Sequence, residues 1–116
     1  MKFLIFNGSL KADAESNTFA VCKMAQLAFE KMGHECEVIT MRDLDYEGAT
    51  SDVNDELKPH IMKMFKADGV IFATPIWWGN HSCHIQAMLE RLDVIYSWAK
   101  DNKHQPFYNK VFGTLV

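Results

Sequence analysis

Short apolar runs alternate with helical patterns along this chain, and that alternation limits the possible folds more than any other feature. The runs lie at 3–6, 37–41, 70–74 and 111–116, and each is too short for a helix. Continuous apolar runs of this length are typical of strands buried on both faces of a parallel sheet. Strands that alternate with helices predict an α/β fold with helices on both faces of a parallel, doubly wound sheet.

The first helix is predicted between the first two strands. Ser16 or Asn17 can cap its start, and Gly33 follows its end. Apolar side chains fall at helical spacing on what we expect to be its buried face: Val21, Met24, Ala25, Ala28 and Met32.

Two further helices follow from the same periodicity. The second has Pro59 in its first turn, where a missing N–H costs little. Its apolar face comprises Leu57, Ile61, Met64 and Phe65. The third helix precedes the last strand, and its apolar face comprises Ile85, Met88, Leu89, Leu92 and Tyr96. The acidic, turn-rich segment 43–55 is predicted to be a solvated loop.

Length and composition favour one globular domain over residues 1–116, because 48% of the residues are hydrophobic. A net charge of −3 without clustered basic residues argues against a nucleic-acid partner. No apolar segment is long enough for a signal peptide or a membrane span, so we expect a cytoplasmic protein without a membrane partner. Three cysteines without paired spacing, Cys22, Cys36 and Cys83, predict free thiols.

The loop after the first strand carries the first candidate site. Gly8 allows a tight turn, and Ser9, Ser16 and Thr18 supply hydroxyl groups beside the start of a helix. Unpaired N–H groups and the positive end of a helix dipole favour a phosphate there. The loop has neither the G-x-G-x-x-G nor the P-loop pattern. The alternative is an ordinary capped helix entry.

The loop after the third strand carries the second candidate site, because Trp77 and Trp78 stand beside Gly79. Adjacent aromatic side chains suit a flat heterocycle, and glycine permits close approach of the backbone. The alternative is that one or both tryptophans pack in the core or in a subunit interface. His81, Cys83 and His84 follow, but a structural zinc site needs four ligands, so we expect no metal site.

These two loops resemble those of the NAD(P)H-dependent FMN reductase-like branch of the flavodoxin-like superfamily. The similarity extends from the first strand to the third helix, and it rests on 7–9, 16–18, 68–79 and 86–93. It implies a three-layer α/β/α flavodoxin-like fold that binds FMN. No cysteines cluster as they do in some iron–sulfur relatives, so an iron–sulfur cluster is not expected.

The resemblance also implies residue roles. Ser9, Ser16, Asn17 and Thr18 would hold the FMN phosphate, and Lys11 would help to neutralise it. The ribityl chain and isoalloxazine ring would lie against Pro75, Ile76, Trp77, Trp78, Gly79 and Asn80. Family members usually carry hydride from NAD(P)H through the flavin to a quinone, a flavin or another acceptor. The flavin supplies that chemistry, so no side chain is expected to be catalytic.

The sequence stops inside or just after the fourth predicted strand, whereas the resemblance implies a fifth strand and further helices in full family members. We therefore expect an incomplete domain with exposed apolar sheet surface and an unpaired edge. A second copy of the chain could cover that sheet face in a homo-oligomer. Two alternatives to a reductase remain: a flavodoxin-type electron carrier, and a fragment that keeps the fold but binds no flavin.

Overall fold

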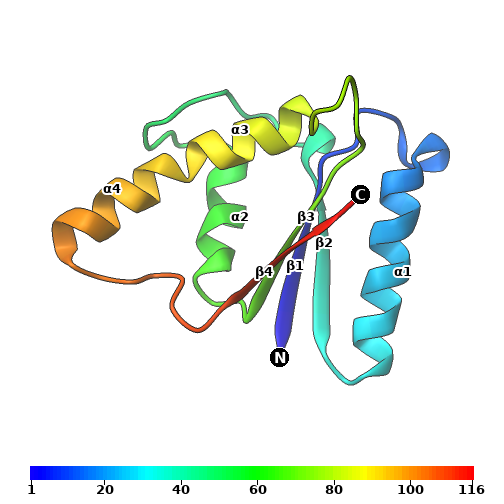
Figure 1. Ribbon diagram of the computed structural model, residues 1–116, viewed down its shortest axis with the longest axis horizontal. Coiled ribbons are helices and arrows are strands. Elements are labelled where there is room, and N and C mark those ends of the chain that lie inside the picture. The colour runs from blue at the N-terminus through cyan, green and yellow to red at the C-terminus, as the bar shows by residue number, and fades with distance from the viewer.

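Four parallel strands form one sheet in the order β2-β1-β3-β4 in the computed structural model, which describes residues 1–116 (Figure 1). Their bounds are β1 (Lys2–Asn7), β2 (Glu35–Thr40), β3 (Gly69–Ala73) and β4 (Val111–Leu115). The chain runs from the central strand β1 outward to β2, then crosses back to β3. The strand order reverses at this point, and this topology confirms the predicted doubly wound, flavodoxin-like fold.

Alternating side chains divide the sheet into two apolar faces. Ile5 lies beside Val38 and Ile71 on one face, while Leu4 and Phe6 point to the other. Each central strand is therefore buried on both sides, which explains the continuous apolar runs in the sequence.

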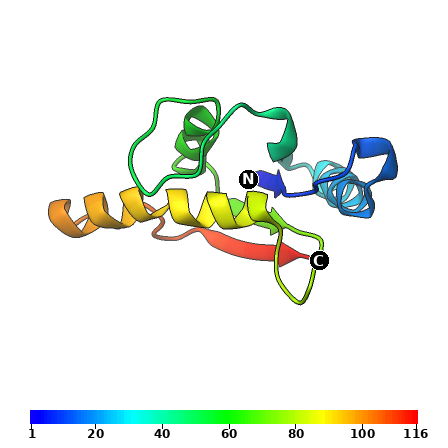
Figure 2. The ribbon, with the colours of Figure 1, turned by 90° about the horizontal axis from the view of Figure 1, so that it is seen from above.

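Helices cover both faces, as the alternation predicted. Helix α1 (Asn17–Lys31) packs on the face of Ile5. Helices α2 (Leu57–Met64) and α3 (Cys83–Arg91) pack on the face of Leu4 and Phe6. Helix α4 (Asp93–Asn102) continues from α3 as an almost unbroken rod that runs beyond the sheet (Figure 2).

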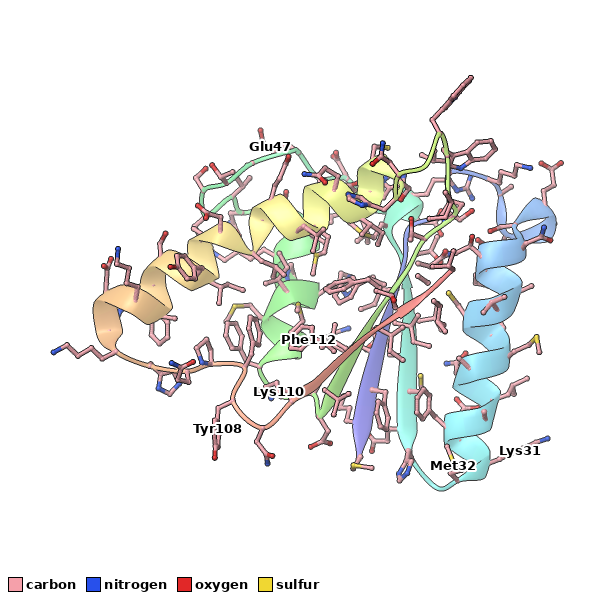
Figure 3. All side chains as sticks on the ribbon, viewed as in Figure 1. Lys31, Met32, Glu47, Tyr108, Lys110 and Phe112 are labelled. Atoms are coloured by element: carbon pink, nitrogen blue, oxygen red, sulfur yellow. The ribbon has the colours of Figure 1, made fainter.

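The predicted buried face of α1 is wrong except at Ala25. Cys22, Ala25 and Phe29 pack toward the sheet, and Phe29 stacks on Phe3 with ring centres 4.1 Å apart. The helix is fixed on the β1–β2 side because Gln26 donates a 2.8 Å hydrogen bond to the carbonyl of Cys36. Exposed instead are Val21, Met24, Ala28 and Met32. Figure 3 shows Met32 at the end of α1, beside the turn that leads to β2.

The predicted third helix is also corrected, because it divides at Leu92 into α3 and α4. Ile85 and Met88 are buried as expected, but Leu89 and Tyr96 are exposed. Helix α4 runs beyond the sheet, so Tyr96 reaches solvent rather than the core, and Leu89 on α3 is 41% exposed (Figure 2).

Strand β4 forms an edge of the sheet and is poorly covered. Val111 is 71% exposed and Phe112 is 41% exposed, although Phe112 contacts Phe107 edge-on (Figure 3). The ammonium group of Lys110 fixes the start of the strand by donating to the carbonyls of Phe65 at 2.9 Å and Ala67 at 2.6 Å. The structure thus contains both the exposed apolar surface and the unpaired edge expected from the sequence.

Candidate functional site

The two candidate loops meet where β1 and β3 end at the same edge of the sheet. The N–H of Gly8 donates to the carbonyl of Ala73 at 2.8 Å and joins the loops directly. A Cβ atom at Gly8 would lie 2.5 Å from Ile85 Cγ1 and 2.7 Å from Ser82 Oγ. The first turn of α3 can therefore pack against this turn only because residue 8 is glycine.

Asn7 holds the first loop from within the protein. It is fully buried, and its Oδ1 accepts a 3.1 Å hydrogen bond from the N–H of Ser9. Its Nδ2 donates to Thr40 Oγ1 at 3.3 Å, which ties the loop to the end of β2. The amide of Asn7 therefore fixes the position of Ser9.

The hydroxyls of Ser9 and Ser16 form a small internal network. Ser16 Oγ donates to Ser9 Oγ at 2.6 Å and accepts from the N–H of Phe19 at 3.0 Å, as the predicted cap of α1. Ser9 Oγ accepts from the N–H of Lys11 at 3.2 Å. Both hydroxyls thus shape the loop, and each already has partners within the chain.

Free hydrogen-bond donors lie one residue further along. The backbone N–H groups of Asn17 and Thr18, in the first turn of α1, donate to no atom of the chain. The hydroxyl of Thr18 forms no hydrogen bond within the chain either. Together with the α1 dipole and the Lys11 ammonium, these donors form what we call the anion cradle, comprising Ser9, Lys11, Ser16, Asn17 and Thr18.

The second loop folds into a tight hairpin from Trp77 to Asn80. Trp77 and Asn80 exchange two backbone hydrogen bonds, of 2.9 and 3.0 Å. Trp78 and Gly79 form the turn with φ angles of 51° and 78°. Glycine adopts this conformation easily, whereas in Trp78 it costs about 1 kcal/mol.

The two tryptophans have different environments. Trp77 is 48% exposed, and the ammonium group of Lys11 lies 6.0 Å from its ring centre, within the range of a cation–π interaction. Trp78 is completely exposed. Neither ring packs in the core, so that part of the alternative is wrong, whereas a place in a subunit interface stays a prediction.

A cavity of about 210 Å³ opens between the two loops. It brings together seven predicted site residues: Ser9, Lys11, Ser16, Asn17, Thr18, Pro75 and Trp77. Leu10 and Glu15 also line it and were not predicted. Ile76, Trp78, Gly79 and Asn80 lie outside it. Because sites for whole ligands usually span about 300–1000 Å³, this cavity suits the phosphate end of a nucleotide.

Two positioning residues were missed. The N–H of Ser82 donates to Thr74 Oγ1 at 2.8 Å, which closes the loop at its base. Ser82 Oγ caps α3 by accepting from the N–H of Ile85. A serine three residues before the first apolar position of a helix is a capping signal that could have identified Ser82.

His81 and His84 have different partners. His81 Nε2 contacts the amide oxygen of Gln86, whereas His84 Nδ1 forms a hydrogen bond with the hydroxyl of Tyr46. No three metal-ligating side chains lie close together. Burial, and secondarily the charge of Arg42, lower the pKa of His84 below 6.5. The histidine is therefore neutral at pH 7, and in the tautomer protonated at Nε2 its Nδ1 accepts a hydrogen bond from the Tyr46 hydroxyl.

None of the helices is both long enough and apolar enough to cross a bilayer. The fold and the two loops define a flavodoxin-like α/β domain with a cavity between the loops at the switch in strand order. The sequence pattern of the family described as NADPH-dependent FMN reductase matches residues 1–116. The chain belongs to this family of flavin-dependent oxidoreductases.

Individual relatives agree with this assignment. The chain is 30% identical over 129 residues to 8-demethyl-8-aminoriboflavin-5'-phosphate synthase of Streptomyces davaonensis, covering 100% of the chain and 50% of that protein. It is 25% identical over 100 residues to an iron-sulfur flavoprotein of Archaeoglobus fulgidus, covering 78% of the chain and 48% of that protein. The chain thus spans about half the length of these relatives.

A solved structure shows the same arrangement of strands and helices. RosB with the bound intermediate 8-demethyl-8-formylriboflavin-5'-phosphate superposes with a TM-score of 0.83 at 30% identity. The match covers 98% of this chain and 50% of that one. The similarity therefore involves nearly the whole chain.

Proposed function

We propose that this chain binds FMN, with the phosphate in the anion cradle and the flavin ring beside Trp77. One observation carries the proposal: the unpaired N–H groups of Asn17 and Thr18 lie in one cavity with Lys11 and Trp77. A phosphate needs convergent donors and a positive charge, and a flavin ring needs a flat apolar wall.

The donors of the cradle fit a phosphate monoester. Two backbone N–H groups, the Thr18 hydroxyl and the Lys11 ammonium all donate, as a dianion requires. Glu15 also lines the cavity, and its carboxylate would repel a phosphate. The ammonium group of Lys11 is needed to offset this repulsion. The hydroxyl of Ser9 can turn toward a phosphate, because its own donation to the Lys11 carbonyl is long, at 3.4 Å.

The proposed activity is transfer of hydride from NAD(P)H to a quinone, a flavin or another small acceptor. Bound FMN supplies the hydride and electron chemistry. The chain holds the phosphate with the anion cradle and positions the ring with the loop from Pro75 to Asn80. Trp77 excludes water from one side of the site. No side chain serves as a nucleophile or general acid in this proposal.

FMN titration of cradle variants tests the binding site. Thr18→Val removes the hydroxyl and should weaken FMN binding about fivefold, since a neutral hydrogen bond contributes about 1 kcal/mol. Lys11→Met should weaken it about tenfold or more, because it removes the only cation of the cradle. Lys31→Met, at the opposite end of α1 (Figure 3), is the matched control and should bind FMN normally. Normal affinity in both cradle variants would refute the site.

A steady-state assay tests the reaction. Reconstituted protein should oxidise NADPH or NADH when a quinone is supplied, at a rate that depends on bound FMN. Flavin that is reduced by one electron from a protein donor, but not by either nicotinamide, would favour the electron-carrier alternative. Folded protein that retains no flavin would favour the fragment alternative.

A second candidate function treats the flavin phosphate as substrate. The relative with 30% identity is named for synthesis of a modified riboflavin phosphate, and RosB holds such an intermediate. Mass spectrometry of the flavin after incubation with the protein separates the two functions. An unchanged FMN mass after many turnovers supports the cofactor role, whereas a converted flavin supports the substrate role.

The remaining expectations from the sequence stay predictions. They are a cytoplasmic location and a second copy of the chain over the exposed sheet face. The exposed side chain of Val111 on β4 is consistent with the latter. Loss of self-association in Val111→Lys would support it.

A further inference from the structure

The ammonium group of Lys11 lies over the ring of Trp77, 6.0 Å from the ring centre. Both residues line the cavity of the anion cradle. Lys11 takes part in none of the four ion pairs of the chain, and Glu15, which lines the same cavity, is not paired with it. The indole ring is therefore the partner of this ammonium group within the chain.

The ammonium group and a stacked ligand ring cannot share this side of the indole. Carbon atoms in contact lie about 3.5 Å apart, so a flat ring would stack on Trp77 at about that distance. A second contact, from the ring to the ammonium group, would bring the total to about 7 Å. The ammonium group lies closer than this, at 6.0 Å from the ring centre. Lys11 must therefore move before a flat ring can stack on Trp77.

A phosphate in the anion cradle would give Lys11 a stronger partner. The free N–H groups of Asn17 and Thr18 line the same cavity as the lysine. A charge-assisted hydrogen bond to a phosphate is stronger than an exposed cation–π interaction. Phosphate binding should thus draw the ammonium group away from Trp77 and leave the face of the ring free.

We propose that Lys11 determines specificity for flat heterocycles that carry a phosphate monoester, because it covers Trp77 until a phosphate occupies the anion cradle. The inference rests on the proposed FMN site and adds selection against the ring without its phosphate. Riboflavin has to displace the ammonium group from Trp77 without offering it another partner. FMN displaces the same group and binds it through its phosphate.

The proposal gives Lys11 opposite effects on two ligands. A lysine that only neutralised the phosphate would have no influence on riboflavin, which has none. A lysine that also covers Trp77 should hinder riboflavin. Lys11→Ala should therefore weaken FMN binding about tenfold. It should strengthen riboflavin binding about two- to fivefold, which is the contribution of an exposed cation–π interaction.

Fluorescence titration of both flavins against three variants tests the proposal. Lys11→Ala should show the two opposite changes. Lys11→Arg should keep both affinities near those of the wild type, because a guanidinium group also stacks on aromatic faces and binds phosphate. Lys31→Ala is the matched control for the loss of one positive charge, since Lys31 lies at the far end of α1 (Figure 3). Circular dichroism checks that each variant is folded.

Inorganic phosphate provides a second measurement that involves no flavin. A Trp78→Phe/Trp98→Phe variant keeps Trp77 as its only tryptophan, since the chain has three. Phosphate added at constant ionic strength should change its emission, because the ammonium group leaves the ring. The same variant with Lys11→Ala should not respond.

The outcomes separate this inference from the proposed function. Riboflavin affinity that is unchanged or lower in Lys11→Ala, together with weaker FMN binding, would overturn the inference and leave the FMN site intact. An equal response of Trp77 to phosphate with and without Lys11 would also overturn it. Folded wild-type protein that binds no FMN would overturn the proposed function, and this inference with it.

Discussion

Arg91 of α3 and Asp55 of the loop before α2 form an ion pair that is almost completely buried. Their side chains are 3% and 11% exposed, and Nη1 of Arg91 lies 3.1 Å from Oδ1 of Asp55. The same guanidinium donates to the carbonyls of Val53 and Glu47. One side chain therefore holds the long loop 44–56 against α3, and Figure 3 labels Glu47 in this loop.

Arg91→Met should lower the free energy of unfolding by about 3 kcal/mol, because it leaves the Asp55 carboxylate buried without its partner. Urea denaturation followed by circular dichroism measures this change. Arg42→Met is the control, since Arg42 forms only an exposed ion pair with Asp43, which contributes less than about 1 kcal/mol. Equal midpoints for the two variants would show that the buried pair does not hold the loop.

The free energy of unfolding should fall as the pH falls below about 6.5. Burial lowers the pKa of His84 and of His60 in the folded protein, with Arg42 and Lys63 adding to the effect. As the pH falls, these two histidines therefore take up protons in the unfolded chain before they do so in the folded protein. The stabilisation is complete above about pH 6.5 and is lost as the pH falls toward the pKa values of the folded state. Denaturation between pH 8 and 5 measures this, and His84→Asn should reduce the slope. An unchanged slope in that variant would argue against a neutral His84 paired with Tyr46.

Gly8→Ala should destabilise the protein by about 1–3 kcal/mol and weaken FMN binding, since its Cβ would overlap Ile85 and Ser82. Gly48→Ala is the matched control, because a Cβ atom there meets nothing within 4 Å. Thermal unfolding and an FMN titration measure the two effects. If Gly8→Ala behaves like Gly48→Ala, the two loops do not meet as described.

Cys83 should react with a thiol reagent before the other two cysteines. Cys83 is exposed, whereas Cys22 is buried, and its burial raises the pKa of its thiol to about 11. Burial also raises the pKa of Cys36. Because the thiolate is the reactive form, one equivalent should react rapidly at pH 8 in native protein and three after unfolding. Rapid reaction is predicted to disappear in Cys83→Ser; its persistence would contradict this order.

The sequence predicted the strands, their alternation with helices along the chain and the start of α1, because these depend on local patterns. Ser16 caps α1 as expected, and Gly33 follows it with a φ of 82°. The buried face of α1 could not be read in the same way. Apolar residues occur around most of this helix, so the Phe3–Phe29 contact between distant segments decides which side faces the sheet.

Only the part of the candidate site that depends on local sequence was predicted. The cradle follows from one continuous loop, and its residues do meet Pro75 and Trp77. The hairpin that directs Trp78 into solvent and the Thr74–Ser82 hydrogen bond depend on how that loop closes. The division of the third helix into α3 and α4 depends on a break at Leu92 that neither glycine nor proline marks.

The affinities of FMN and riboflavin, compared by fluorescence titration, test the central claim most directly. The two ligands differ only in the phosphate that the anion cradle is proposed to bind. Two charge-assisted hydrogen bonds to this phosphate contribute about 3 kcal/mol, so FMN should bind about 100-fold more tightly than riboflavin. Equal affinities, or no binding of FMN by folded protein, would contradict the account.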